Sequence, residues 1–150
     1  VQLETGLTLQ SSTFDQAIEY SDELESKRKF LRTPDLYGFA TFSFTPNKKF
    51  KTSVNLVYTG SMELIHLAGS PEQKMDEYVN SNTFTELSFK TGYTFKLEEI
   101  DTNLELYAGM KNIFNAYQND FDTGKNRDSN FIYGPGAPRT LFIGVKINTL

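Results

Sequence analysis

Residues 83–111 read TFTELSFKTGYTFKLEEIDTNLELYAGMK. In this stretch, apolar and polar side chains alternate in two runs, which flank a short charged segment. In the first run, every second residue from Leu87 to Phe95 is apolar or threonine, and Glu86 and Lys90 occupy positions of the opposite phase. Successive side chains of a β-strand point to opposite faces of the sheet. The stretch therefore predicts two antiparallel strands joined by a tight turn, with one apolar and one polar face.

The same alternation recurs along the rest of the chain. The predicted strands cover residues 1–13, 36–45, 50–59, 83–96, 102–111 and 140–149. Short turns are expected at 46–49 and 97–101, and long connections at 14–35, 60–82 and 112–139. Short turns at one end and long loops at the other are typical of outer-membrane β-barrels. The sequence thus predicts an all-β fold, an antiparallel up-and-down meander of about six strands.

Composition narrows the function classes. A chain of 150 residues is expected to form one domain. Its net charge of −4 argues against nucleic acid as a partner, because no basic stripe is available to neutralise phosphates. The chain has no cysteine, so it has neither a disulfide framework nor thiolate chemistry. No apolar run approaches the roughly 20 residues that a membrane-spanning helix needs.

The alternation already begins at Val1, without an initiator methionine, and this predicts a piece of a longer protein. Six strands are also fewer than the roughly eight that the smallest membrane barrels contain. If the chain ends where the barrel ends, the last strand finishes on the periplasmic side and the three long connections lie outside the cell. A soluble β-sandwich has the same one-sided alternation and remains an alternative.

Two segments near the end of the chain carry a family resemblance. Residues 106–115, LYAGMKNIFN, and residues 133–140, YGPGAPRT, resemble the asparagine–aromatic and Pro-Gly-x-Pro-Arg segments that precede the last strand of TonB-dependent outer-membrane receptors. Residues 31–60 are also similar to this family, particularly to receptors from the Bacteroidetes. One departure is Leu150, which is not aromatic and is out of phase with the apolar set of the last predicted strand.

The resemblance implies that residues 1–150 form the C-terminal portion of a transmembrane barrel of about 22 strands, with the plug domain and the remaining strands absent. It implies an active importer in the outer membrane of a Gram-negative bacterium, energised by the TonB system, and not an enzyme. The expected partners are outer-membrane lipid, TonB and a scarce nutrient such as a corrinoid, haem, a ferric siderophore or a glycan. No cofactor is expected. The alternatives are a passive porin and a soluble carbohydrate-binding β-sandwich.

The last long connection holds the predicted ligand-binding residues. Aromatic rings there alternate with amides and acids, which suits a large, polar, partly planar ligand. The candidates are Tyr117, Phe121, Asp122, Phe131 and Tyr133. Packing of these rings onto neighbouring loops is the alternative.

Two further hypotheses concern metal binding. His66, the only histidine, is expected to be a solvated loop residue rather than a ligand of haem or a metal. Residues 119–128 are rich in oxygen ligands, but Phe131 stands where an EF-hand has its glutamate. An ordinary polar turn is the alternative to calcium binding. No Ser–His–acid arrangement stands out, so no catalytic residue is predicted.

Overall fold

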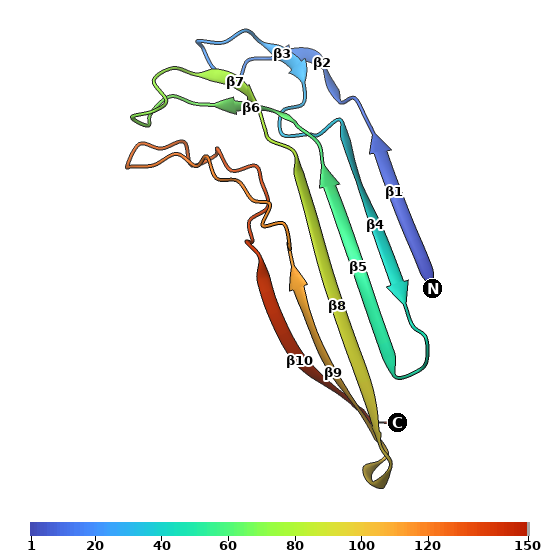
Figure 1. The fold of residues 1–150 in the computed structure, drawn as a ribbon. Coiled ribbons are helices and arrows are strands. Elements are labelled where there is room, and N and C mark those ends of the chain that lie inside the picture. Colours follow the sequence, from blue (N-terminus) through green and yellow to red (C-terminus); the bar gives the residue numbers. More distant parts are fainter. Residues whose placement is uncertain (150) are drawn as a thin grey trace.

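A computed structural model describes residues 1–149, and its main element is a single antiparallel sheet in the order β1-β4-β5-β8-β9-β10 (Figure 1). The six strands are β1 (Gln2–Leu9), β4 (Leu36–Phe44), β5 (Phe50–Thr59), β8 (Phe84–Leu97), β9 (Thr102–Lys111) and β10 (Thr140–Thr149). Neighbouring strands of the sheet follow one another along the chain, except that two small hairpins are inserted into the long connections. The predicted all-β meander is confirmed, and Leu150 lies outside the described residues.

The long connections contain structure that the alternation did not predict. The first holds a hairpin of β2 (Thr13–Ile18) and β3 (Lys27–Lys29), and the second holds a hairpin of β6 (Glu63–His66) and β7 (Glu77–Asn80). A short 3₁₀ turn, η1 (Glu98–Ile100), joins β8 to β9. Across residues 1–149, no helix is both long enough and apolar enough to span a membrane.

The prediction that the first strand continues to Thr13 is wrong, because β1 ends at Leu9. The backbone N–H of Gln10 still donates to the carbonyl of Asp35 at 2.9 Å, and its side-chain amide donates to the carbonyl of Pro34 at 2.9 Å. The partner strand β4 begins only at Leu36, and Pro34 has no N–H with which to continue a ladder. The chain therefore leaves the sheet at this point, and Thr13 begins β2 instead.

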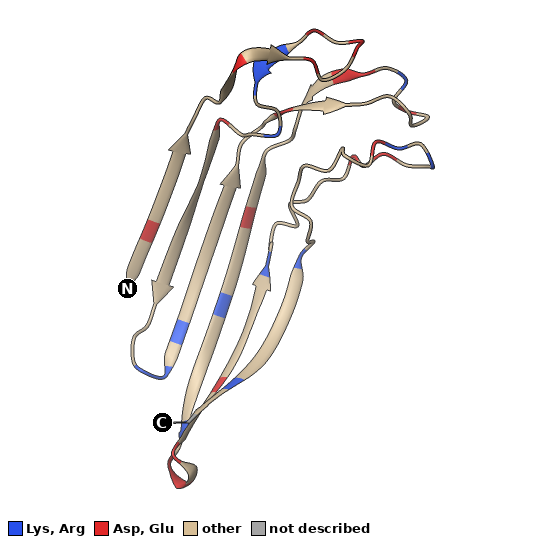
Figure 2. Cartoon of the chain, turned by 180° about the vertical axis from the view of Figure 1, so that it is seen from behind, with Lys and Arg blue, Asp and Glu red and all other residues tan. Residues whose placement is uncertain are grey.

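Connections of different length gather at opposite ends of the sheet. Figure 1 shows the two short turns at the lower end and all three long connections at the upper end. The side-chain oxygen of Asn47 fixes the first turn by accepting from the N–H groups of Lys49 and Phe50, both at 2.9 Å. Charged residues are sparse along the strands and concentrate in the turns and long connections (Figure 2).

Strand register gives the sheet one face without a single charged residue. Side chains that are paired across an antiparallel ladder lie on the same face. For example, Leu3, Phe42, Val54, Phe89, Met110 and Leu141 form one continuous row across all six strands. Within residues 1–149 nothing packs over the β10 part of this face, where Leu141 is 74% and Ile143 86% exposed. The register also confirms that Leu87–Phe95 contribute every second residue to the apolar face, with Glu86 and Lys90 on the polar one.

The opposite, polar face carries the strand charges and a few aromatic rings that lie on glycines. Phe39 pairs with Gly6, Tyr107 with Gly144, and Phe142 with Gly109. A Cβ built on Gly6 would lie 2.6 Å from Cε1 of Phe39, so the ring occupies the space that a side chain would otherwise fill. An aromatic ring that covers a glycine in this way stabilises the strand pair.

Candidate ligand-binding loops

The three long connections, residues 10–35, 60–83 and 112–139, are joined to one another at one end of the sheet, and we call them the loop cap (Figure 1). The first and second are joined by the Ser21 hydroxyl, which donates to the Asp76 carboxylate, and by an ion pair of Lys27 with Glu63. The guanidinium of Arg32 joins the first connection to the third, since it donates to the carbonyls of Asn130 and Ile132. The cap is therefore one interlinked body.

A small hydrophobic core lies between the second and third connections. It consists of Met62, Leu64 and Phe131, with Val79 and Tyr133 packed against it. Leu64 and His66 are buried on one face of β6, whereas Glu63 and Ile65 are only partly covered on the other. The buried face of this strand therefore packs in the cap and not against the main sheet.

His66 is buried in this core, so the prediction of a solvated loop histidine is wrong. Its Nε2 lies 2.8 Å from Oδ1 of Asp122, and the two side chains are only 11% and 6% exposed. The imidazole stacks on the ring of Phe131 with centroids 3.7 Å apart and planes inclined by 5°. The β6–β7 hairpin turns this side chain towards the third connection. The contact of His66 with Asp122 therefore links the second connection to the third.

The acidic segment of the third connection uses its carboxylates on the protein itself. Oδ2 of Asp122 accepts from the N–H of Asp128 at 2.9 Å, and Oδ2 of Asp128 accepts from the N–H of Leu67 at 3.1 Å. Across residues 1–149, no three acidic, histidine or cysteine side chains converge in a way that could hold a metal. The geometry is that of a polar turn, the alternative to calcium binding.

Gln118 is one of the amides that alternate with the aromatic rings of the third connection, but the sequence pattern does not indicate that it is buried. Its Nε2 donates to the carbonyl of Phe131 at 3.0 Å, and its Oε1 accepts from the N–H of Tyr133 at 2.8 Å. The outgoing and returning segments of the third connection are thereby held together around one fully buried amide. Buried polar groups are retained only when their hydrogen bonds are satisfied, as they are here.

The two segments that carry the family resemblance meet at the base of the third connection. Asn112 adopts φ 49°, a left-handed conformation that asparagine tolerates, and its Nδ2 donates to the carbonyls of Ala116 and Ala137 at 2.9 Å. From the other segment, Nε of Arg139 donates to the carbonyl of Ile113 at 2.8 Å. These residues join the start of the loop to its end, which gives a backbone role to both segments.

The predicted ligand-binding residues divide into two groups. Phe131 and Asp122 are packed into the cap, and the hydroxyl of Tyr133 donates to Oδ2 of Asp120 at 2.6 Å. Burial, together with that carboxylate, raises the pKa of Tyr133 above its ordinary value, which keeps the phenol neutral. Tyr117 and Phe121 are 43% and 48% exposed. Direct ligand contact stays a prediction for all five residues, of which Tyr117 and Phe121 are the most exposed.

Comparisons with protein-family models, with curated proteins and with solved structures give no match. The function is therefore argued from the two faces of the sheet and from the loop cap.

Acid is expected to weaken the link between the first two connections. Asp76 accepts from the N–H of Ala68 at 2.7 Å and from the hydroxyl of Ser21, and these bonds lower the pKa of its carboxyl. The stabilisation that these hydrogen bonds give is complete above pH about 3.9, the pKa of an aspartate in an unfolded chain. It is lost as the pH falls through the lower pKa that Asp76 has in the folded protein. Amide exchange at Ala68, corrected for intrinsic rate, should stay slow at pH 5 and become fast only below pH about 4. In the control variant Asp76→Asn, the exchange should show no such transition.

Proposed function

We propose that this chain forms part of the wall of an outer-membrane β-barrel that imports a scarce nutrient, and that its loop cap faces outward and captures the nutrient. The observation that carries the proposal is the charge-free face that runs across six strands and exposes leucine, isoleucine and phenylalanine. In water such a face is an aggregation hazard, whereas in a bilayer it is the surface that meets lipid.

The dimensions of the strands support a membrane location. β5, β9 and β10 each contain 10 residues, and β4 contains 9. A tilted strand needs about 9–11 residues to cross the hydrocarbon core of a bilayer. The aromatic residues Phe50, Tyr93 and Phe95 lie on the apolar face towards the turn end, where an interfacial aromatic girdle is expected.

The two outer strands support a larger barrel. β1 and β10 each have a neighbour on one side only within the described sheet. In a membrane, unpaired backbone groups at a sheet edge are too costly, so the proposal includes further strands that close the barrel. The family resemblance implies about 22 strands around a plug, with import energised by the TonB system. A corrinoid, haem or a ferric siderophore is the expected cargo.

Chemical labelling of intact cells tests the orientation. In the full-length protein, single cysteines replace Lys48 in a short turn or Lys125 in the third connection, both exposed lysines. A membrane-impermeant maleimide should label Lys125→Cys in intact cells, and should label Lys48→Cys only after the outer membrane is permeabilised. Labelling of Lys48→Cys alone in intact cells would reverse the orientation, and recovery of the protein in a detergent-free soluble fraction would exclude the barrel.

Energy dependence tests import. Cells that lack the full-length gene are compared with wild type for uptake of labelled cobalamin, haem and a ferric siderophore. We expect uptake of one ligand to fall on deletion, and the wild-type uptake of that ligand to stop when an uncoupler collapses the proton gradient. Gene-dependent flux that persists with the uncoupler would instead identify a passive porin.

A further inference from the structure

Most of the first connection forms a flap that is joined to the main sheet by two short segments. The flap, residues 12–30, contains β2 and β3 (Figure 1) and is closed at its base by a backbone hydrogen bond of 3.0 Å between its first and last residues. The sheet ends at the bond from the N–H of Gln10 to the carbonyl of Asp35. Ser11 on one side and residues 31–34 on the other lie between these two closed pairs. Short segments of this kind are where hinges form.

The flap is held to the rest of the loop cap without a shared core. Within residues 1–149, no flap residue is buried, whereas the second and third connections share a hydrophobic core. The links from the flap to the second connection are polar, namely the Lys27–Glu63 ion pair, the Ser21–Asp76 hydrogen bond and a bond of 2.8 Å from the Tyr78 hydroxyl to the carbonyl of Glu25. Water can replace such partners, whereas separating a core exposes apolar surface. The flap is therefore the part of the cap that can move as a unit.

A hollow of about 430 Å³ lies at the seam between the flap and the rest of the cap. Phe14, Tyr20 and Phe30 line it on the flap side, and Ile65 of β6 and Asn130 of the third connection line it on the other. The rings of Phe14 and Phe30 pack on each other with centroids 4.1 Å apart, so the flap has an apolar contact of its own. A seam that encloses open space lacks the dispersion contacts that would hold it shut. Its closure therefore depends on the polar links.

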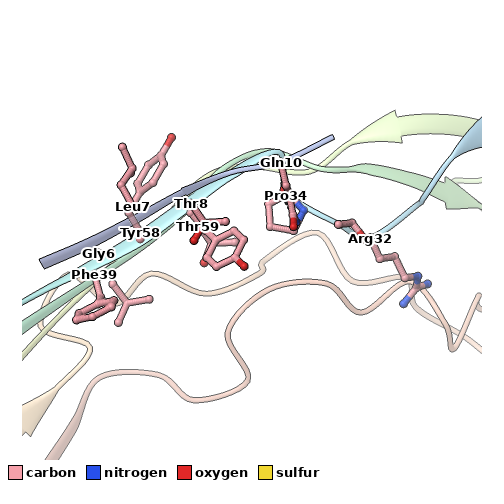
Figure 3. Close-up of a pocket in the computed structure, with 13 residues that line it drawn as sticks. Gly6, Leu7, Thr8, Gln10, Arg32, Pro34, Phe39, Tyr58 and Thr59 are labelled. Atoms are coloured by element: carbon pink, nitrogen blue, oxygen red, sulfur yellow. Dashed lines mark hydrogen bonds between the residues drawn. The ribbon is translucent and has the colours of Figure 1, made fainter. Parts of the chain in front are cut away.

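Arg32 lies in one of the two hinge segments and has a strained backbone. Its φ is 58°, in the left-handed region that residues with a side chain seldom adopt. Its N–H donates to the carbonyl of Glu63 at 2.8 Å, and its guanidinium donates to the carbonyls of Asn130 and Ile132. Figure 3 shows this side chain directed away from Pro34 and from the strands of the sheet. Such strain persists only where the surrounding contacts over-determine the backbone.

The guanidinium contact of Arg32 is one that can break and re-form. Within residues 1–149, Arg32 forms no ion pair, and both of its side-chain acceptors are neutral carbonyls. Arg32, Asn130 and Ile132 are all exposed, so water can bind the groups that separate. Separation leaves no buried charge without a partner, which is the main cost of breaking an ion pair in a protein interior.

We propose that residues 12–30 are a movable flap and that Arg32 is both its hinge and its latch. In the closed form, Arg32 holds the other two connections and the flap covers the hollow. In the open form, the Arg32 backbone relaxes out of the left-handed region and the hollow is uncovered. The inference rests on the proposed function in one respect, because in the proposed barrel the hollow opens towards the outside of the cell. The motion itself needs neither nutrient nor proton gradient, so its failure is distinguishable from failure of import.

Distance measurements by pulsed electron spin resonance on the full-length protein in detergent test the motion. Spin labels replace Ser26 of the flap and Lys125 of the third connection, both exposed residues. We expect a main short distance and a minor longer one. Arg32→Asn removes the guanidinium while keeping a residue that tolerates the left-handed region, and it should raise the longer population about threefold or more. The matched control is Arg28→Asn, because Nε of Arg28 donates to the carbonyl of Phe14 inside the flap, and it should leave the distances unchanged.

Amide exchange distinguishes a swinging flap from an unfolding one. In Arg32→Asn, exchange at residue 32, corrected for intrinsic rate, should accelerate about tenfold because its N–H bonds across the seam. Exchange at Phe30, whose N–H bonds within the flap, should keep the wild-type rate. If Arg32→Asn fails to fold, Lys27→Met removes the ion pair across the seam and should raise the longer population about twofold.

Three results would overturn the inference. The first is a distance distribution that a folded latch variant leaves unchanged, and the second is an equal shift with Arg28→Asn. The third is acceleration at Phe30 as large as that at residue 32, which would mean that the flap unfolds and does not swing. A flap that opens as expected in a protein without energy-dependent uptake would support this inference and contradict the import proposal.

Discussion

Thr91→Arg is expected to reduce assembly of the full-length protein in the outer membrane severalfold or more, whereas Thr94→Arg is expected to be tolerated. Both threonines belong to β8, but Thr91 lies on the apolar face between Thr52 and Ala108 of the neighbouring strands. An arginine on the lipid face costs about 2–4 kcal/mol at the bilayer midplane and about 0–1 kcal/mol near the interfaces, and Thr91 lies one apolar-face position inward from Tyr93 of the proposed girdle. Each 1.4 kcal/mol of this cost corresponds to about a tenfold change in the folding equilibrium.

The Thr94 variant is a matched control because the starting residue, the substitution and the strand are all the same. Thr94 lies on the polar face opposite Glu105 of β9, so the new guanidinium meets a carboxylate. Heat-modifiable migration on gels and the amount in purified outer membranes measure assembly. Equal assembly of the two variants would show that the charge-free face does not meet lipid, and would favour the soluble β-sandwich.

The main sheet could be predicted because each of its strands carries its own signal. Three strands, Phe50–Thr59, Thr102–Lys111 and Thr140–Thr149, have the bounds that their alternation indicated. The face of each residue also followed, since side chains alternate with a period of two whatever the partner strand is. The bounds of β4 and β8 differ from the predicted ones by a single residue. The large boundary error, at the end of β1, arose because the strand ends where its partner does and not where its own alternation does.

The loop cap could not be predicted in this way. Its contacts join residues that are far apart in the chain, such as His66 with Asp122 or Arg32 with Asn130, and no local pattern encodes them. The two hairpins lack a strand signal of their own as well. In β6, the apolar Ile65 lies on the partly covered face and the polar His66 on the buried face, so apolar and polar residues do not alternate. β3 has only three residues, all basic.

The same difficulty applies to the predicted ligand residues. Aromatic composition identified the third connection but did not distinguish a ring that is packed into the cap from a ring that is free. Phe131 and Phe121 are ten residues apart in similar surroundings of amides and acids, yet they are 6% and 48% exposed. What separates them is the β6–β7 hairpin, which brings His66 and Leu64 against the first ring and not the second.

Phe131→Ala is therefore expected to detach the third connection from the second while leaving the main sheet intact. The ring stacks on His66 at 3.7 Å, contacts Tyr133 edge-on at 5.3 Å, and fills the core with Leu64. Removal of a buried phenylalanine costs about 3–5 kcal/mol, and no other large buried side chain can replace this one in so small a core. Amide exchange should accelerate at least tenfold in β6 and around Gln118, but not in β5 or β9.

Phe121→Ala, in the same connection, separates the structural contribution from ligand capture. Its ring is half exposed and, within residues 1–149, stacks on no other aromatic ring, so exchange in β6 should stay at the wild-type rate. If the prediction that Phe121 contacts the imported nutrient is right, this variant should lose ligand affinity without loss of loop order. Faster exchange in β6 with Phe121→Ala than with Phe131→Ala would contradict the assignment of the two rings. It would mean that the exposed ring, and not the histidine-stacked one, holds the cap together.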